Sequence, residues 1–135
     1  MENVIKASLC EENYNIKLQN ESHTFYSDEP EGKGGKNMGL SPFEILSSSL
    51  AACTSITLKM YADRKNWLID ELFVEISFET FTENEIFIAN FRRNITIKGS
   101  KIGEKEKTRL LQIAEVCPVS KILKSSENKI LSSIN

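Results

Sequence analysis

Histidine is nearly absent from this sequence, and its cysteines stand far apart. There is one histidine, His23, and no Cys-x-x-Cys pair among the 135 residues. A zinc ion in a protein is bound by four side chains, mostly Cys and His at short spacings. The sequence therefore predicts no metal site, and we expect the protein to act without a metal or another cofactor.

The sequence also lacks an excess of charge and a long apolar run. Lys and Arg number 17 against 19 Asp and Glu, and the basic residues are scattered, so no basic face for nucleic acid is expected. The longest uncharged run, 45–58, is shorter than the roughly 20 residues of a membrane span. The amino terminus has neither the basic nor the apolar region of a secretory signal. These features predict a cytoplasmic protein that binds neither nucleic acid nor a membrane.

Three cysteines are present, which is an odd number: Cys10, Cys53 and Cys117. Without an export signal, a framework of structural disulfides is not expected. In a reducing compartment, thiols are free, catalytic or redox-active. The cysteines are therefore candidates for chemistry rather than for cross-linking.

Alternating and helical patterns of apolar residues follow one another along the chain. Period-two alternation is typical of half-buried strands, and spacings of three and four are typical of amphipathic helices. The patterns predict strands over 4–9, 14–19, 23–27, 72–81, 85–98 and 129–134, and helices over 41–65, 103–116 and 119–123. A Gly- and Pro-containing loop spans 28–40, and 82–84 is the expected hairpin connection. The order βββ-α-ββ-α-α-β predicts an α+β fold of antiparallel sheets in a single domain over 1–135.

The predicted long helix begins with a capping box and has no charged face in its middle. Ser41 fits the N-cap, Pro42 the first helical position and Glu44 the third. Every residue of 45–58 is uncharged, and a helix without a polar stripe packs on several sides. In so small a domain the protein's own sheet can cover only one of those sides. We therefore expect an obligate homodimer with this helix buried.

Cys117 precedes Pro118 at the predicted start of the last short helix, in the N-cap position. The partial positive charge and unpaired N–H groups of a helix start favour a thiolate. A small buried residue between two helices explains the same position equally well. Taken alone, Cys53 fits a core position better than a catalytic one, and we interpret Cys10 as structural.

Six segments together resemble the central motifs of the OsmC/Ohr family, named after osmotically inducible protein C and organic hydroperoxide resistance protein. They follow one another in family order: DEPEGKGG (28–35), GLSPFEIL (39–46), LAAC (50–53), MYADRK (60–65), FRRNI (91–95) and AEVCPV (114–119). The resemblance implies an OsmC-like fold, in which antiparallel sheets surround a long central buried helix. It also implies an intertwined homodimer.

The resemblance implies a function as well, the thiol-dependent reduction of organic hydroperoxides or hydrogen peroxide. On the family pattern, Cys53 matches the peroxidatic cysteine, Cys117 the resolving cysteine and Glu44 an active-site carboxylate. The Cys53 thiolate would attack the small-molecule peroxide and become a sulfenic acid. Cys117 would condense with it to a disulfide, which an external dithiol would reduce.

Helix geometry restricts the part that Glu44 can play. Nine residues separate Glu44 from Cys53, which corresponds to about 13.5 Å of rise and about 180° of rotation. Glu44 therefore cannot touch Cys53 of its own helix and can reach such a thiol only across a dimer interface. The capping box by itself also explains a glutamate at this position.

One feature of the family is missing. Family peroxidases hold the thiolate with an arginine from the early β-hairpin, but 11–14 contains no basic residue and the first arginine of the chain is Arg64. Arg64, Lys33 and Lys36 are the candidate substitutes. The missing arginine supports an alternative function: an OsmC-like dimer with weak or no peroxidase activity that binds a small apolar or thiol-reactive ligand in its interface cleft.

Overall fold

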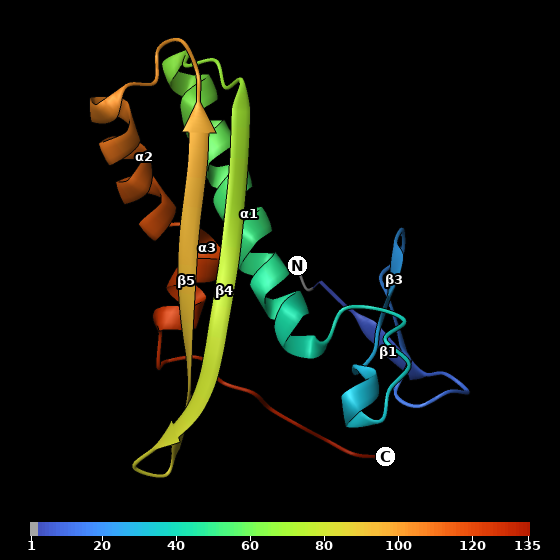
Figure 1. Cartoon of the computed structure of the whole chain (residues 1–135). Coiled ribbons are helices and arrows are strands. Elements are labelled where there is room, and N and C mark those ends of the chain that lie inside the picture. Colours follow the sequence, from blue (N-terminus) through green and yellow to red (C-terminus); the bar gives the residue numbers. More distant parts are fainter. Residues whose placement is uncertain (1–2) are drawn as a thin grey trace. The chain divides into compact units, whose positions relative to one another are not determined.

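The computed structural model describes residues 3–135 (Figure 1). The chain divides into two compact units, 1–46 and 47–135, and each is described here by itself. The long helix α1, Pro42–Lys65, begins in the first unit and continues through the second.

The first unit is a three-stranded antiparallel meander followed by a loop. Its strands are β1 (Lys6–Leu9), β2 (Ile16–Gln19) and β3 (Thr24–Ser27), in the order β1-β2-β3. The register pairs Lys6 with Gln19 and Ile16 with Ser27. The three strands predicted from alternation are confirmed, each somewhat shorter than expected. A single 3₁₀ turn, η1 (Glu31–Lys33), lies within the predicted loop.

Asp28 organises this loop. Its carboxylate is 2% exposed. One oxygen accepts the backbone N–H groups of Tyr14 and Glu29 at 2.9 and 2.7 Å, and the other accepts those of Lys36 and Met38 at 3.2 and 3.1 Å. Burial raises the pKa of Asp28, but these four hydrogen bonds outweigh burial and lower it. A single buried charge thus ties the β1–β2 turn to both ends of the loop.

Helix α1 begins as the capping box predicts. The Ser41 N–H donates to the Glu44 carboxylate at 3.0 Å, and the Glu44 N–H donates to the Ser41 hydroxyl at 3.4 Å. Within the second unit, one face of the helix is buried, and its members are Ser47, Leu50, Thr54, Leu58, Tyr61 and Ala62. Ile56 and Met60 lie outside this face and are 55% and 62% exposed. A single chain therefore covers one side of the uncharged helix and leaves apolar side chains of another side uncovered.

A long β-hairpin follows α1. Strands β4 (Glu71–Glu83) and β5 (Ile86–Lys98) pair antiparallel, and Glu83 pairs with Ile86 across the turn. The connection is therefore Asn84-Glu85 rather than the expected 82–84. Both turn residues have positive φ, 51° and 65°, as a two-residue type I′ turn requires. This turn type matches the right-handed twist of the strands, so the strand pairing continues up to the residues that flank the turn.

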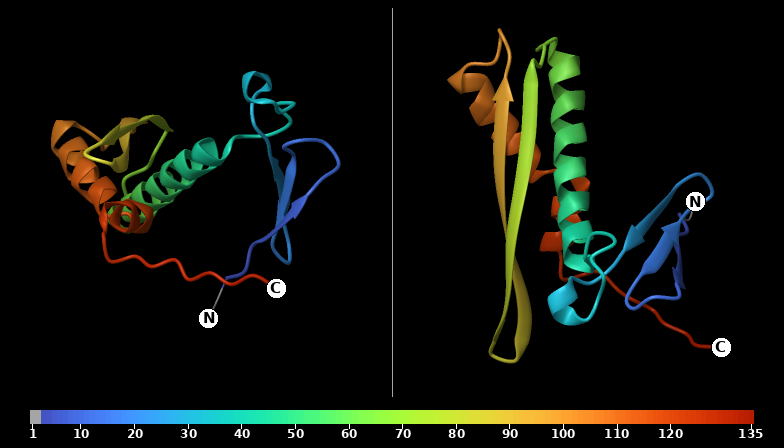
Figure 2. Two further views of the ribbon diagram at one scale, coloured as in Figure 1. Left: turned by 90° about the horizontal axis from the view of Figure 1, so that it is seen from below. Right: turned by 45° about the vertical axis from the view of Figure 1, so that its right-hand side comes forward.

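The core of the second unit lies between this hairpin and the helices. Helices α2 (Glu104–Glu115) and α3 (Pro118–Lys124) follow β5, and α1 and α2 lie on the same side of the β4–β5 ribbon (Figure 2). Six buried residues form the core: Leu58, Tyr61, Ile97, Ile102, Leu110 and Ala114. They come from α1, β5, the β5–α2 loop and α2, so the helix predicted as amphipathic over 103–116 is confirmed.

The strand predicted over 129–134 is absent. Within the described chain, 125–135 forms neither helix nor strand, and Ile130, Leu131 and Ile134 are 93%, 92% and 97% exposed. A strand needs a neighbour to accept and donate its backbone hydrogen bonds, and none of the strands described over 3–135 pairs with the segment. The remaining order, βββ-α-ββ-α-α, is α+β as predicted. Among the described residues, no helix has the length and apolar character required to span a membrane.

Candidate active site

Cys117 lies at the junction of α2 and α3 and caps α3. Its backbone is extended, with φ −63° and ψ 143°, and Pro118 takes the first helical position. The sulfur accepts the backbone N–H of Ser120 at 3.4 Å, which is the N-cap interaction predicted from the sequence. The side chain is fully buried, at 0% exposure. The helix-start and buried-residue interpretations of Cys117 are thus both correct.

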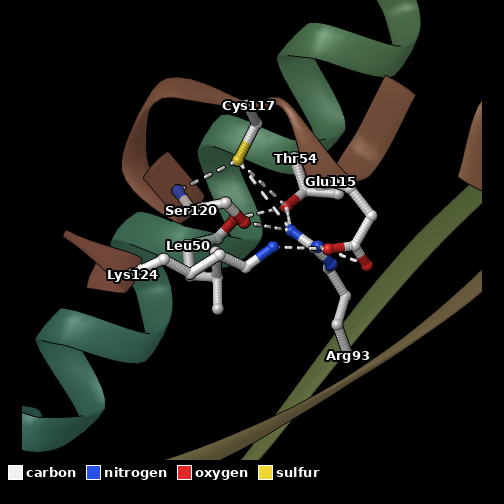
Figure 3. Close-up of polar contacts among 7 residues, drawn as sticks. All are labelled: Leu50, Thr54, Arg93, Glu115, Cys117, Ser120 and Lys124. Atoms are coloured by element: carbon white, nitrogen blue, oxygen red, sulfur yellow. Dashed lines mark hydrogen bonds and ion pairs between the residues drawn. The ribbon is translucent and has the colours of Figure 1, made fainter. Parts of the chain in front are cut away.

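Arg93 of β5 reaches the same sulfur (Figure 3). Its Nη1 lies 3.9 Å from the Cys117 sulfur and donates to the hydroxyls of Thr54 and Ser120 at 2.9 and 2.8 Å. Its Nη2 lies 3.4 Å from a carboxylate oxygen of Glu115. A cation, two hydroxyls and a thiol from three different elements therefore meet at one point inside the second unit.

Thr54 and Glu115 make further hydrogen bonds that hold this arrangement in place. The Thr54 hydroxyl donates to the Leu50 carbonyl one turn earlier at 2.7 Å and lies 3.7 Å from the Cys117 sulfur. Glu115, at the end of α2, accepts from Lys124 of α3 at 2.6 Å while it pairs with Arg93. The polar groups around the thiol are thus fixed by α1 on one side and by α2 and α3 on the other.

The surroundings favour the ionised form of Cys117. Burial raises the pKa of its thiol, but hydrogen bonds, the largest of them from the Ser120 side chain and the Ser120 backbone, outweigh burial. These hydrogen bonds lower the pKa to about 7. About half of the Cys117 thiols are therefore thiolates at neutral pH.

Cys53 lies next to Thr54 on α1, and its side chain is half-buried. Because its thiol is among the groups that lower the pKa of Cys117, the structure brings together the two cysteines singled out from the sequence. All three cysteines are free thiols, and Cys10 lies in the first unit. The arrangement can support thiol–disulfide chemistry between α1 and the α2–α3 junction.

Residues 33–130 match the family model described as OsmC-like protein. The chain belongs to the OsmC-like protein family. Its fold resembles an OsmC-like protein from Mycoplasma pneumoniae, at 22% identity and a TM-score of 0.74 over 93% of this chain and 89% of that one. It also resembles organic hydroperoxide resistance proteins from Legionella pneumophila (17%, TM-score 0.71, 92% and 90% covered) and Elizabethkingia anophelis (21%, 0.69, 93% and 91%). No curated protein matches the sequence.

The expected carboxylate of this OsmC-like chain, Glu44, is exposed and belongs to the capping box at the start of α1. Hydrogen bonds from the Ser41 backbone and side chain lower the pKa of Glu44, so it is ionised at neutral pH. Its helix-capping role is therefore confirmed, whereas a role in chemistry stays a prediction.

Arg93 is the site residue that the sequence analysis missed. Arg64, one of the three suggested substitutes for the missing hairpin arginine, instead lies over the ring of Tyr61, 5.9 Å from its centre. A signal for Arg93 was present in the alternation of β5, where Phe91, Arg93 and Ile95 share one face. A charged residue in an inward-facing position of a strand needs a buried polar partner, and here the partners are Thr54 and Ser120.

A cavity of about 520 Å³ opens beside this cluster. Its walls combine polar and apolar side chains of the second unit, including Arg93, Glu115, Ser120, Leu50, Phe91 and Leu123. The described residues contain no group of three or more His, Cys, Asp or Glu side chains able to hold a metal ion. The functional groups offered to a small molecule here thus include a guanidinium, a hydroxyl and a carboxylate beside apolar surface.

Proposed function

We propose that this OsmC-like protein is a thiol-dependent peroxidase that reduces organic hydroperoxides or hydrogen peroxide with Cys53 and Cys117 as its redox pair. The observation that carries the proposal is the buried Cys117 thiol, whose pKa is lowered to about 7 by its neighbours, the more accessible Cys53 among them. Two proteins of similar fold are named organic hydroperoxide resistance proteins, which agrees with this chemistry. Free thiols suit a reducing compartment, and we propose a cytoplasmic location.

The proposed reaction has three balanced steps. The Cys53 thiolate attacks the terminal peroxide oxygen, the O–O bond breaks, and a proton from solvent completes the alcohol or water that leaves, so Cys53 becomes a sulfenic acid. The Cys117 thiolate then attacks the Cys53 sulfur, and hydroxide leaves as water after taking up a proton. An external dithiol finally reduces the disulfide in two exchange steps, returns two thiols and is itself oxidised to a disulfide.

The working form that we propose is a homodimer. The uncovered Ile56 and Met60 on α1 support it, because exposed apolar side chains on a long uncharged helix suit a second protein surface. Glu44 would then act on Cys53 of the second copy, as the spacing along α1 requires. Size-exclusion chromatography with light scattering tests this directly: a monomer at micromolar concentration would refute both the dimer and the role of Glu44.

The peroxidase proposal is tested by following cumene hydroperoxide in the presence of a dithiol. We expect the unsubstituted protein to consume it and the Cys53→Ser protein to lose turnover. Cys10→Ser is the matched control, because it removes a thiol outside the second unit and should leave turnover unchanged. Equal turnover by the Cys53→Ser and unsubstituted proteins would refute the proposal.

The cavity beside Arg93 favours a second candidate function, the binding of a small apolar or thiol-reactive ligand with little or no peroxidase activity. Its walls combine apolar side chains, such as Leu50 and Phe91, with polar ones, such as Arg93, and a small ligand with both kinds of surface would suit them. The two functions differ in what a peroxide does to the protein. A peroxidase gives a Cys53–Cys117 disulfide after one equivalent of hydroperoxide, whereas a binding protein keeps its free thiols, and mass spectrometry distinguishes the two.

A further inference from the structure

The Arg93 guanidinium contacts the Cys117 sulfur and the hydroxyls of Thr54 and Ser120. The guanidinium comes from the central part of β5, where Arg93 pairs with Ile76 of β4, and its side chain is 11% exposed. One nitrogen, Nη1, faces the sulfur and both hydroxyl oxygens, while Nη2 is taken up by Glu115. The cation is thus oriented from both sides, and its position does not depend on the thiol.

The hydrogen bonds of Ser120 show what this orientation achieves. Its hydroxyl oxygen accepts from Arg93 at 2.8 Å, so its own hydrogen remains to be donated elsewhere. The neighbouring Cys117 sulfur accepts the Ser120 backbone N–H at 3.4 Å, and the Ser120 side chain lowers the pKa of this thiol. Arg93 therefore leaves the Ser120 hydroxyl hydrogen available to the sulfur.

Thr54 completes the arrangement in a different way. Its hydrogen is donated to the Leu50 carbonyl, so its oxygen is available as an acceptor for Arg93 at 2.9 Å. This bond fixes the guanidinium against α1, one residue from Cys53. The same cation thus touches the helix that carries one thiol and the helix start that carries the other.

We infer that Arg93 is a positioning residue for the second step of the proposed reaction, which orients Ser120 and faces the sulfur so that Cys117 is ready to attack the Cys53 sulfenic acid. The inference rests on the proposed function and deepens it. In this inference Arg93 acts on Cys117, the resolving thiol, and other groups activate Cys53.

The expected effect on the rate is modest, and the effect on its pH dependence is large. If the Cys117 pKa returned to the free value of about 8.5, the thiolate fraction at pH 7 would fall about 15-fold. The more basic thiolate would be about fivefold more nucleophilic, since its reactivity rises by 0.4–0.5 log units for each pKa unit. Disulfide closure would then slow only about threefold at pH 7, so the pH midpoint is the sharper measurement.

The experiment follows disulfide closure in a Cys10→Ser background after one equivalent of cumene hydroperoxide. Samples are quenched over time between pH 5.5 and 9.5, and dimedone traps the remaining sulfenic acid for mass spectrometry. In the background protein we expect closure with a midpoint near pH 7. With Arg93→Gln, the midpoint should move toward about 8.5 and the Cys53 dimedone adduct should accumulate. Arg93→Lys should restore part of the shift, because it keeps the charge but not the planar fork.

Arg92→Gln is the matched control, because it removes an exposed arginine one position earlier on β5 and should leave the midpoint unchanged. An unchanged midpoint in Arg93→Gln overturns the inference, provided that Cys53 is oxidised in the background protein. If Cys53 is not oxidised there, the proposed function itself has failed. A titration of thiolate ultraviolet absorbance in Cys10→Ser/Cys53→Ser proteins then still decides whether Arg93 sets the ionisation of Cys117.

Discussion

Ser120→Ala is the substitution that separates the hydrogen bonds at the Cys117 sulfur most cleanly. It removes the side-chain donor but keeps the Ser120 backbone N–H, which lies 3.4 Å from the sulfur. It removes one of the two hydroxyl partners of Arg93, and Thr54 at 2.9 Å remains. The change is one oxygen atom in a buried side chain, so the helix start itself should persist.

The expected rise of the Cys117 pKa follows from the free energy that one hydrogen bond to a charged group contributes. Such a bond contributes about 1.5–3 kcal/mol, and a pKa shift of one unit corresponds to about 1.4 kcal/mol. Loss of the Ser120 side-chain bond should therefore raise the Cys117 pKa by about one to two units from its value of about 7. At pH 7 the thiolate fraction should fall from about half to between about 1% and 10%.

The assay is a titration of thiolate absorbance in a Cys10→Ser/Cys53→Ser background, where Cys117 is the single remaining thiol. Because folding lowers the pKa of this acid, its contribution to stability is present above the unfolded pKa and is lost as pH falls through about 7. The Ser120→Ala protein should therefore be destabilised most at alkaline pH, with the difference shrinking toward pH 7 and below. An unchanged midpoint would refute the reasoning and would place the lowering of the pKa in the backbone N–H and the helix start.

Three further predictions concern the scaffold. Asp28→Asn should lower the melting temperature at neutral pH, and because the Asp28 pKa is lowered by folding, the difference should fade in acid as the native carboxylate is protonated. Leu58→Ala should cost about 2–5 kcal/mol in urea unfolding, since Leu58 is fully buried in the core. Ile56→Ala is its exposed counterpart on α1, and a cost above about 1 kcal/mol there would indicate that a second chain covers it. Glu85→Gly should raise the melting temperature by a few degrees, because φ is 65° at this turn position and glycine adopts it without strain.

The elements that could be predicted from the sequence are those whose signals are local. Ser41 and Glu44, three residues apart, indicated the start of α1, and the alternation in 72–81 and 85–98 indicated the two long strands. The expected connection, 82–84, began two residues and ended one residue too early, because Asn84-Glu85 carries no glycine to indicate its positive φ. Local patterns thus located the elements but not the conformation of an atypical turn.

Long-range features of the site escaped the sequence analysis for a different reason. Arg93 is 24 residues from Cys117 and 39 from Thr54, and only the pairing of β4 with β5 against α1 brings these groups together. The strand expected over 129–134 also depends on a distant partner, and the sequence of this segment does not say which backbone would supply one. The position of Arg93 at the site and the conformation of 129–134 both depend on tertiary contacts, which the periodicity of the sequence does not indicate.

The N-cap position of Cys117 gives the redox state a mechanical consequence for α3. The Cys117 sulfur accepts the Ser120 N–H. In a Cys53–Cys117 disulfide the same sulfur would be bonded to Cys53 and could no longer be a thiolate. A neutral disulfide sulfur is a poorer acceptor, and the loss of an N-cap costs a helix about 0.5–2 kcal/mol. Helix α3 has only seven residues, so this cost is a large part of its stability. Oxidation should therefore loosen its first turn, and faster amide hydrogen exchange at Ser120 would make that helix a reporter of the catalytic cycle.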